Sequence, residues 1–195
     1  MSSTHRNLKI FLAICLYLVV LSSVLAGTRP GGDFSLTDHN NQKFQLQQLR
    51  GNVVLLFFGY TSCPDVCPLE LGKIAQVLTV FEEKNDPVKG LFITVDPDRD
   101  TPLKLKQYTS FFNKQLQGLT GSREQIDQVV KQYRVNYRIS ENEKNHIVVD
   151  HSSNLYVIDK KGELNTIIPF GMGLNHVMRV VESLLNKKEV AVTPD

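Results

Sequence analysis

The chain has 195 residues, of which 42% are hydrophobic and 22% are charged. This composition is typical of one globular domain with a sizeable core, and it excludes a disordered or collagen-like chain. The formal net charge is +2, and removing residues 1–27 leaves 20 basic and 20 acidic residues. A neutral domain offers no basic stripe to a phosphate backbone, so we expect no nucleic-acid partner.

The N-terminus contains a 17-residue run without a charged side chain, residues 10–26. Because basic residues precede this run, residues 1–27 are predicted to be a membrane anchor, with the rest of the chain on the far side of the membrane. The last residues of the run, Val-Leu-Ala, also resemble a cleavage site, so a removable signal segment is the alternative. A short linker, 28–32, follows.

Strands are predicted from apolar runs and alternating patterns. The segment 33–52 alternates around a polar turn and predicts a β-hairpin, whereas "VVLLFFGY", 53–60, is a continuous apolar run typical of a strand buried on both faces. Further strands are expected over 88–96 and 116–121, followed by two more within 146–171, joined by the turn "DKKGE".

Four helices are predicted between these strands. Apolar residues recur at helical spacing from Pro64 to Lys84. Thr101 and Pro102 form an N-cap and first-turn pair, and Ser122 stands three residues before Gln125, the spacing of a capping box. A closing amphipathic helix is expected over 173–187.

The predicted order alternates strands and helices after the hairpin. This alternation favours an α/β fold in which a central sheet is flanked by helices on both faces. The domain is expected over 33–187, with a loose tail over 188–195. Ligands bind at the carboxyl ends of the strands in such sheets, which is where the first buried strand leads into a helix.

Two of the three cysteines, Cys63 and Cys67, lie at this position with three residues between them. The third, Cys15, is an apolar filler within the N-terminal run. With Cys63 at the start of a helix and Cys67 one turn later, the sulfurs would share a face, with Cβ atoms about 5–6 Å apart. That spacing is wider than the usual spacing of about 3.5–4.5 Å in a disulfide, although an adjusted first turn could form one. It also suits a shared metal ion.

A third metal ligand was sought among the five histidines. His39 and His176 are interpreted as surface residues. His146 and His151 flank "IVVD" and would point to opposite faces of a strand, so at most one can serve. His151, at the junction before the next strand, is the candidate, and a hydrogen-bonded loop histidine is the competing interpretation.

The donor chemistry favours copper. Soft thiolates with one imidazole suit Cu(I), which accepts three ligands, whereas zinc would need a fourth. Asp65 and Asp150 are conceivable extra donors, although exposed acids are common in loops. The acidic run "DPDRDTP", 96–102, lacks the glycine and distant glutamate of a calcium loop, so we interpret it as a strand-to-helix connection.

Several motifs together resemble the Sco/SenC family. They are "FFGYTSCPDVCPLEL", "FITVDPDRDTP", "GLTGSREQI" and "VDHSSNLYVID", in the family's order, and the resemblance covers nearly all of 33–185. It implies a thioredoxin-like fold and a copper chaperone for cytochrome c oxidase assembly. It also implies that Cys63, Cys67 and His151 are the metal ligands. The segment "VDHSS" has no proline where thioredoxins keep one beside their cysteines, which counts against a general oxidoreductase.

The resemblance also implies partners and a location. The expected partners are the copper-accepting subunit of a terminal oxidase, a thiol reductant, and the membrane through the N-terminal segment. The expected location is the bacterial inner membrane with the domain in the periplasm, or the periplasm itself if the segment is cleaved. The alternative function is a thiol-disulfide oxidoreductase that reduces the target's cysteines, with Cys63 as nucleophile and Cys67 as resolving thiol.

Overall fold

The computed structural model describes residues 29–141, 147–151 and 153–186, without the side chains of 138–141 and 147–151. The described helices and strands belong to a compact unit that begins at Gly31. The predicted anchor, 1–27, and tail, 188–195, lie outside the described residues. None of the described helices has the length and apolarity that a membrane crossing requires.

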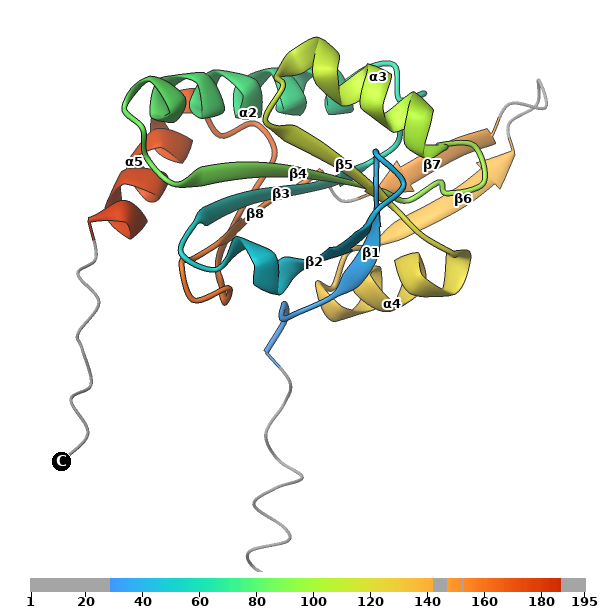
Figure 1. Ribbon diagram of the computed structural model, residues 1–195. Coiled ribbons are helices and arrows are strands. Elements are labelled where there is room, and N and C mark those ends of the chain that lie inside the picture. Colours follow the sequence, from blue (N-terminus) through green and yellow to red (C-terminus); the bar gives the residue numbers. More distant parts are fainter. Residues whose placement is uncertain (1–28, 142–146, 152, 187–195) are drawn as a thin grey trace, which may run out of the picture. The chain divides into compact units, whose positions relative to one another are not determined.

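A mixed seven-stranded sheet forms the centre of the domain, in the order β2-β1-β5-β4-β3-β8-β9 (Figure 1). The strands β3, β4 and β5 run parallel to one another, and the other pairings are antiparallel. The predicted N-terminal hairpin is confirmed as β1 and β2. The bounds are β1 Ser35–Asp38, β2 Lys43–Gln45, β3 Val53–Gly59, β4 Val88–Thr94, β5 Leu116–Thr120, β8 Leu155–Ile158 and β9 Leu164–Ile168.

Helices cover both faces of the sheet, as the alternation of elements predicts. They are α2 Val66–Glu83, α3 Pro102–Phe112, α4 Arg123–Gln132 and α5 Leu174–Leu185, with a short 3₁₀ helix, η1, at Leu46–Leu49. One face of β3 packs in a cluster with α2, α3 and α5, and the other face packs in a cluster with α4 and β1. Because β3 is covered on both faces, all seven of its residues are buried.

The predicted helix starts are confirmed for α3 and α4. The Thr101 side chain accepts a hydrogen bond from the Lys104 backbone N–H, with Pro102 in the first turn. Ser122 and Gln125 form the reciprocal capping box. These signals are local in sequence, so they set the helix starts without help from distant contacts.

Two predictions about elements were wrong. Helix α2 begins at Val66, with Asp65 as N-cap, rather than at Pro64. In addition, β6, Tyr137–Glu141, and β7, Ile147–His151, form a separate antiparallel two-stranded sheet. The stretch 146–171 therefore contributes β7 to that small sheet, and β8 and β9 to the main one.

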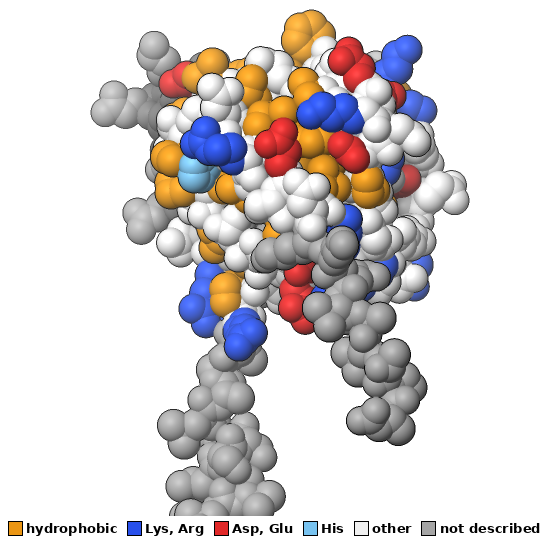
Figure 2. All heavy atoms as spheres, turned by 90° about the vertical axis from the view of Figure 1, so that its left-hand side faces the viewer, with side chains coloured by type: hydrophobic (Ala, Val, Ile, Leu, Met, Phe, Trp, Pro, Cys, Tyr) orange, Lys and Arg blue, Asp and Glu red, His pale blue; other side chains and the backbone are white. Residues whose placement is uncertain are grey.

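The face on the side of α5 carries hydrophobic side chains interspersed with both positive and negative ones (Figure 2). An ion pair in this region joins Lys84, at the end of α2, to Glu182 of α5, with 3.8 Å between Nζ and Oε1. Both side chains are about half exposed, so this pair adds little to stability.

Candidate metal centre

The two cysteines lie just beyond the carboxyl end of β3. Cys63 is in a turn closed by its own N–H, which donates to the Tyr60 carbonyl at 3.2 Å. Cys67 is the second residue of α2. Because the helix starts at Val66, Cys63 stands outside it, and the prediction of two cysteines on one helix face was wrong. The turn, rather than helical spacing, brings Cys63 to Cys67.

Cys63 and Cys67 are free thiols and form no disulfide with each other. A hydrogen bond between the Cys63 and Cys67 side chains, together with burial, raises the pKa of the Cys67 thiol, and a backbone hydrogen bond from Tyr60 only partly opposes this. Cys67 is fully buried, whereas Cys63 is half-buried. An incoming ion or thiol therefore reaches Cys63 first.

Gly59, the last residue of β3, makes room for the Cys67 sulfur. A Cβ atom on Gly59 would lie 2.8 Å from Cys67 Sγ and 2.8 Å from Phe92 Cε2. Contacts this short do not occur for real Cβ atoms, so the absence of a side chain at Gly59 allows Cys67 to pack against the strand.

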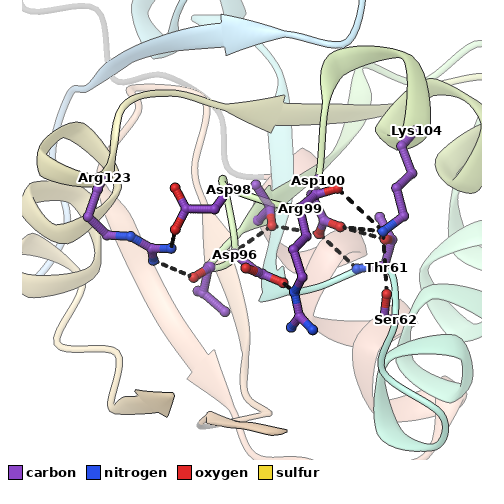
Figure 3. A network of polar contacts seen from close by, with 10 residues as sticks. Thr61, Ser62, Asp96, Asp98, Arg99, Asp100, Lys104 and Arg123 are labelled. Atoms are coloured by element: carbon purple, nitrogen blue, oxygen red, sulfur yellow. Dashed lines mark hydrogen bonds and ion pairs between the residues drawn. The ribbon is translucent and has the colours of Figure 1, made fainter. Parts of the chain in front are cut away.

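A buried carboxylate holds the turn that carries Cys63 (Figure 3). The Asp100 side chain has no exposed surface. It accepts hydrogen bonds from the Thr61 N–H at 2.9 Å, the Thr61 hydroxyl at 2.5 Å and the Thr94 hydroxyl at 2.7 Å. These bonds fix the backbone two residues before Cys63 to the loop that follows β4.

Lys104 of α3 reinforces this connection. Its ammonium lies 3.2 Å from Asp100 Oδ1 and 3.4 Å from both the Ser62 hydroxyl and the Arg99 carbonyl. The charge of Asp100 is therefore compensated, as a buried carboxylate requires. We call Asp100, Thr61, Thr94, Lys104 and Ser62 the turn clasp.

The acidic loop 96–100 uses its carboxylates internally. Asp96 pairs with Arg99, and Asp98 pairs with Arg123 at 2.5 Å (Figure 3). The Arg123 guanidinium also donates to the Val95 carbonyl at 3.0 Å. The segment connects β4 to α3, as the sequence predicted, and each of its three acids is paired with a basic side chain.

The structure describes the side chains of His39 and His176 but not those of His146 and His151. His151 ends β7, where its backbone is opposite Tyr137 of β6, but its side chain lies outside the described residues. The same holds for Asp150, and His146 falls outside altogether. Among the described side chains, no group of three or more His, Cys, Asp and Glu converges as a metal site. The third ligand therefore remains a prediction.

His39 is not the surface residue that the sequence suggested. Its Nδ1 accepts a hydrogen bond from the Gly118 N–H at 3.2 Å and lies 3.2 Å from the Thr109 hydroxyl. His39 thus links the β1–β2 turn to α3 and β5, far from the cysteines in the sheet. His176 is half-buried on α5, and Asp65 is exposed at the start of α2.

Three residues around the thiols were missed by the sequence interpretation: Gly59, Asp100 and Tyr108. Asp100 acts through a contact with a segment far away in the sequence, and Gly59 through the close approach of the Cys67 side chain. No periodic pattern marks contacts of this kind. The only available signal was for Asp100, because an acid in a loop after a buried strand lies at the sheet edge where the cysteines also lie.

The geometry defines a thioredoxin-like domain with a reduced dithiol at the carboxyl end of its central strand. The SCO1/SenC family model matches residues 24–186. The chain belongs to the SCO1/SenC family, which confirms the resemblance drawn from the sequence motifs.

The relatives include an SCO2-like protein of Rickettsia conorii, 40% identical over 135 residues. That alignment covers 68% of this chain and 66% of the relative, so the chain spans slightly less than two thirds of the relative's length. Among solved structures, Arabidopsis thaliana ScoI with copper bound is 33% identical, with a TM-score of 0.77, over 82% of this chain and all of that one.

A more distant structure shares the fold at 21% identity and a TM-score of 0.65, over 83% of this chain and 96% of that one. It is BsSco, described as a member of the Sco family of cytochrome c oxidase assembly proteins. These structures confirm the predicted thioredoxin-like fold, and copper is the ion held by the solved plant relative.

Proposed function

We propose that the chain is a copper metallochaperone that holds one copper ion through Cys63, Cys67 and His151. It delivers the ion to the copper centre of cytochrome c oxidase during assembly. The observation that carries this proposal is the pair of reduced, contacting thiols in a family whose plant member was solved with copper. A buried dithiol prepared in this way offers two soft donors to one ion.

Strand register supports His151 as the third ligand. Leu155 of β8 pairs with Phe57 of β3, two residues before Gly59. The chain just before Leu155 therefore reaches the same edge of the sheet as the cysteine turn. Tyr137, opposite His151 in the small sheet, packs against the same apolar cluster as Cys63.

The donor set suits a carrier. Two thiolates and an imidazole satisfy Cu(I), while half-buried Cys63 leaves one side open to an incoming thiolate. Ligand exchange can then transfer the ion without unfolding. Copper binding needs both cysteines deprotonated and reduced, so oxidation to a Cys63–Cys67 disulfide would close the site.

The setting that we propose follows from the N-terminal run. Residues 10–26 anchor the protein in the bacterial inner membrane, and the domain over 33–187 faces the periplasm, where a thiol reductant keeps the cysteines open. Cleavage after the run would release the same domain into the periplasm.

The alternative function is reduction of the target's disulfide. The Cys63 thiolate would attack the target disulfide, and Cys67 would then displace the second target thiol. This leaves a Cys63–Cys67 disulfide and two reduced target cysteines. The hydrogen bond between the two thiols places Cys67 where it can attack a mixed disulfide on Cys63.

The substitution His151→Ala separates the two functions. In the full chain, purified in mild detergent, we expect Cu(I) binding to weaken at least about tenfold, measured by competition with a coloured chelator, because one of three ligands is lost. Exchange with a model disulfide should be unchanged. His146→Ala, at the other end of β7, is the matched control. Full-strength copper binding by His151→Ala would overturn the chaperone site.

A further inference from the structure

Tyr108 of α3 carries a buried hydroxyl that has no hydrogen-bond partner in the described part of the chain. Its ring is held between two others, with centroid distances of 5.6 Å to Phe92 and 5.3 Å to Phe112. A hydroxyl that loses water without gaining a partner is destabilising, and such groups are rare in native structures. The position therefore calls for an acceptor that the described side chains do not supply.

The Tyr108 side chain belongs to the same region of the core as the dithiol. Tyr108 packs in the same apolar cluster as Cys63 and Cys67. It rests on Phe92, and both the Phe92 ring and the Cys67 sulfur crowd the space above Gly59. Burial raises the pKa of Tyr108, and negative charge on Cys67 and Cys63 raises it further. The phenol thus remains protonated, and it is within electrostatic reach of both sulfurs.

In the metal-free state the sulfurs hydrogen-bond to each other. Metal binding removes the thiol protons and turns both sulfurs into anionic acceptors. Hydrogen bonds to charged acceptors are stronger than those between neutral groups. The acceptor that Tyr108 lacks would then be created by metal loading.

We propose that the Tyr108 hydroxyl donates a hydrogen bond to the Cys63–Cys67 thiolate pair in the metal-loaded protein and so strengthens metal binding. This inference rests on the proposed function, because it assigns a further residue to the same site. Tyr108 acts through the sulfurs and does not bind the ion itself.

The test is Tyr108→Phe in the full chain. This change keeps the ring packing and removes only the hydroxyl. We expect Cu(I) affinity to fall about tenfold, as the loss of one charge-assisted hydrogen bond predicts. The melting temperature of the reduced, metal-free variant should be equal to or above that of the wild type, because an unsatisfied polar group has been removed.

Tyr133→Phe is the matched control. The Tyr133 hydroxyl donates to the Gly32 carbonyl at 2.9 Å, within the other apolar cluster. Its removal should lower the melting temperature and leave the Cu(I) affinity unchanged. The two variants therefore have opposite expected patterns, which a purely structural role for Tyr108 would not produce.

A second ion separates this inference from the proposed function. Cd(II), a thiophilic ion without redox chemistry, is titrated into the same variants, and its thiolate charge-transfer absorption reports binding. If the wild type binds no Cu(I) but Tyr108→Phe still weakens Cd(II), the chaperone proposal fails and the Tyr108 inference stands. Unchanged affinity of Tyr108→Phe for both ions would overturn the inference. A fall in metal-free melting temperature equal to that of Tyr133→Phe would also overturn it.

Discussion

The Cys67 sulfur lies where a side chain on Gly59 would otherwise point. Adding a single methyl group at Gly59 therefore tests the packing of the site. In Gly59→Ala, the new methyl group would lie 2.8 Å from the Cys67 sulfur and the Phe92 ring, both of which are packed. We expect a loss of about 1–3 kcal/mol in the free energy of unfolding, the usual range for overpacking. Displacement of the sulfur should also weaken Cu(I) binding. Denaturant unfolding and copper titration measure the two effects.

Gly72, in the middle of α2, is the control for this change. A Cβ atom there meets nothing within 4 Å. Gly72→Ala should stabilise the protein by about 0.5–1 kcal/mol through helix propensity, with copper affinity unchanged. If the two alanine variants have the same stability and the same copper affinity, Gly59 is not needed to accommodate the Cys67 sulfur.

His39 makes folding stability depend on pH. Its pKa is lowered from the ordinary 6.5, chiefly by burial, with Asp38 opposing and Lys106 adding to the shift. The unfolded chain therefore binds a proton at higher pH than the folded one. The stability contributed by neutral His39 is present above pH 6.5 and is lost as the pH falls through the lower folded value.

The measurement is the melting temperature between pH 7.5 and 5 for the wild type and His39→Gln. Glutamine retains an acceptor for the Gly118 N–H but does not titrate. We expect the variant to lose less stability on acidification than the wild type. Parallel curves would show that His39 keeps its ordinary pKa in the fold.

For single residues, the sequence identified the two cysteines but not the residues that surround them. Cys63 and Cys67 were identifiable from their spacing and position after an apolar run. Asp100 was not, because its contact with Thr61 spans 39 positions. Tyr108 was not, because its place beside the apolar cluster of the cysteines comes from tertiary packing. His39 was misassigned for the same reason, since its Gly118 contact spans 79 positions.

Among the elements, the connection between the β4–α3 loop and the β3–α2 turn is the feature on which the site depends. In Asp100→Asn, one carboxylate oxygen becomes an amide donor facing groups that are themselves donors, including Lys104. We expect a loss of about 1–3 kcal/mol in the free energy of unfolding. The Cys63 turn should loosen, so the rate of Cys63–Cys67 disulfide formation should change as well.

Asp98→Asn, in the same loop, is the comparison. Asp98 is 74% exposed and pairs only at the surface with Arg123, so its loss should change stability by no more than about 0.5 kcal/mol. Thermal unfolding compares the stability of the two variants, and thiol trapping compares their rates of Cys63–Cys67 disulfide formation. If Asp100→Asn is as stable as Asp98→Asn, the turn clasp does not stabilise the Cys63 turn.

Elements with a local signal were predictable, and those defined by tertiary pairing were not. Thr101 and Ser122 set the starts of α3 and α4 through their own side chains. The start of α2 was placed two residues too early, because Pro64 suits a first helical turn but here belongs to the turn that carries Cys63. Strand β6 was missed, and among the described strands it pairs with β7 alone.

For the whole molecule, alternation of strands and helices predicted an α/β sheet covered on both faces, and the seven-stranded sheet agrees. The strand order could not be derived, because β3 pairs in parallel with β4 and antiparallel with β8, about a hundred residues later. This pairing is the reason why a segment near His151 and the cysteine turn reach one edge of the sheet.

The most direct test of that convergence is X-ray absorption spectroscopy of the full chain loaded with one equivalent of Cu(I). The account predicts a copper ion with two sulfur neighbours and one nitrogen neighbour in the wild type. In His151→Ala the nitrogen should be lost, whereas in His146→Ala it should remain. A copper environment that is identical in the wild type and His151→Ala would contradict the proposal that His151 joins Cys63 and Cys67 in holding the metal.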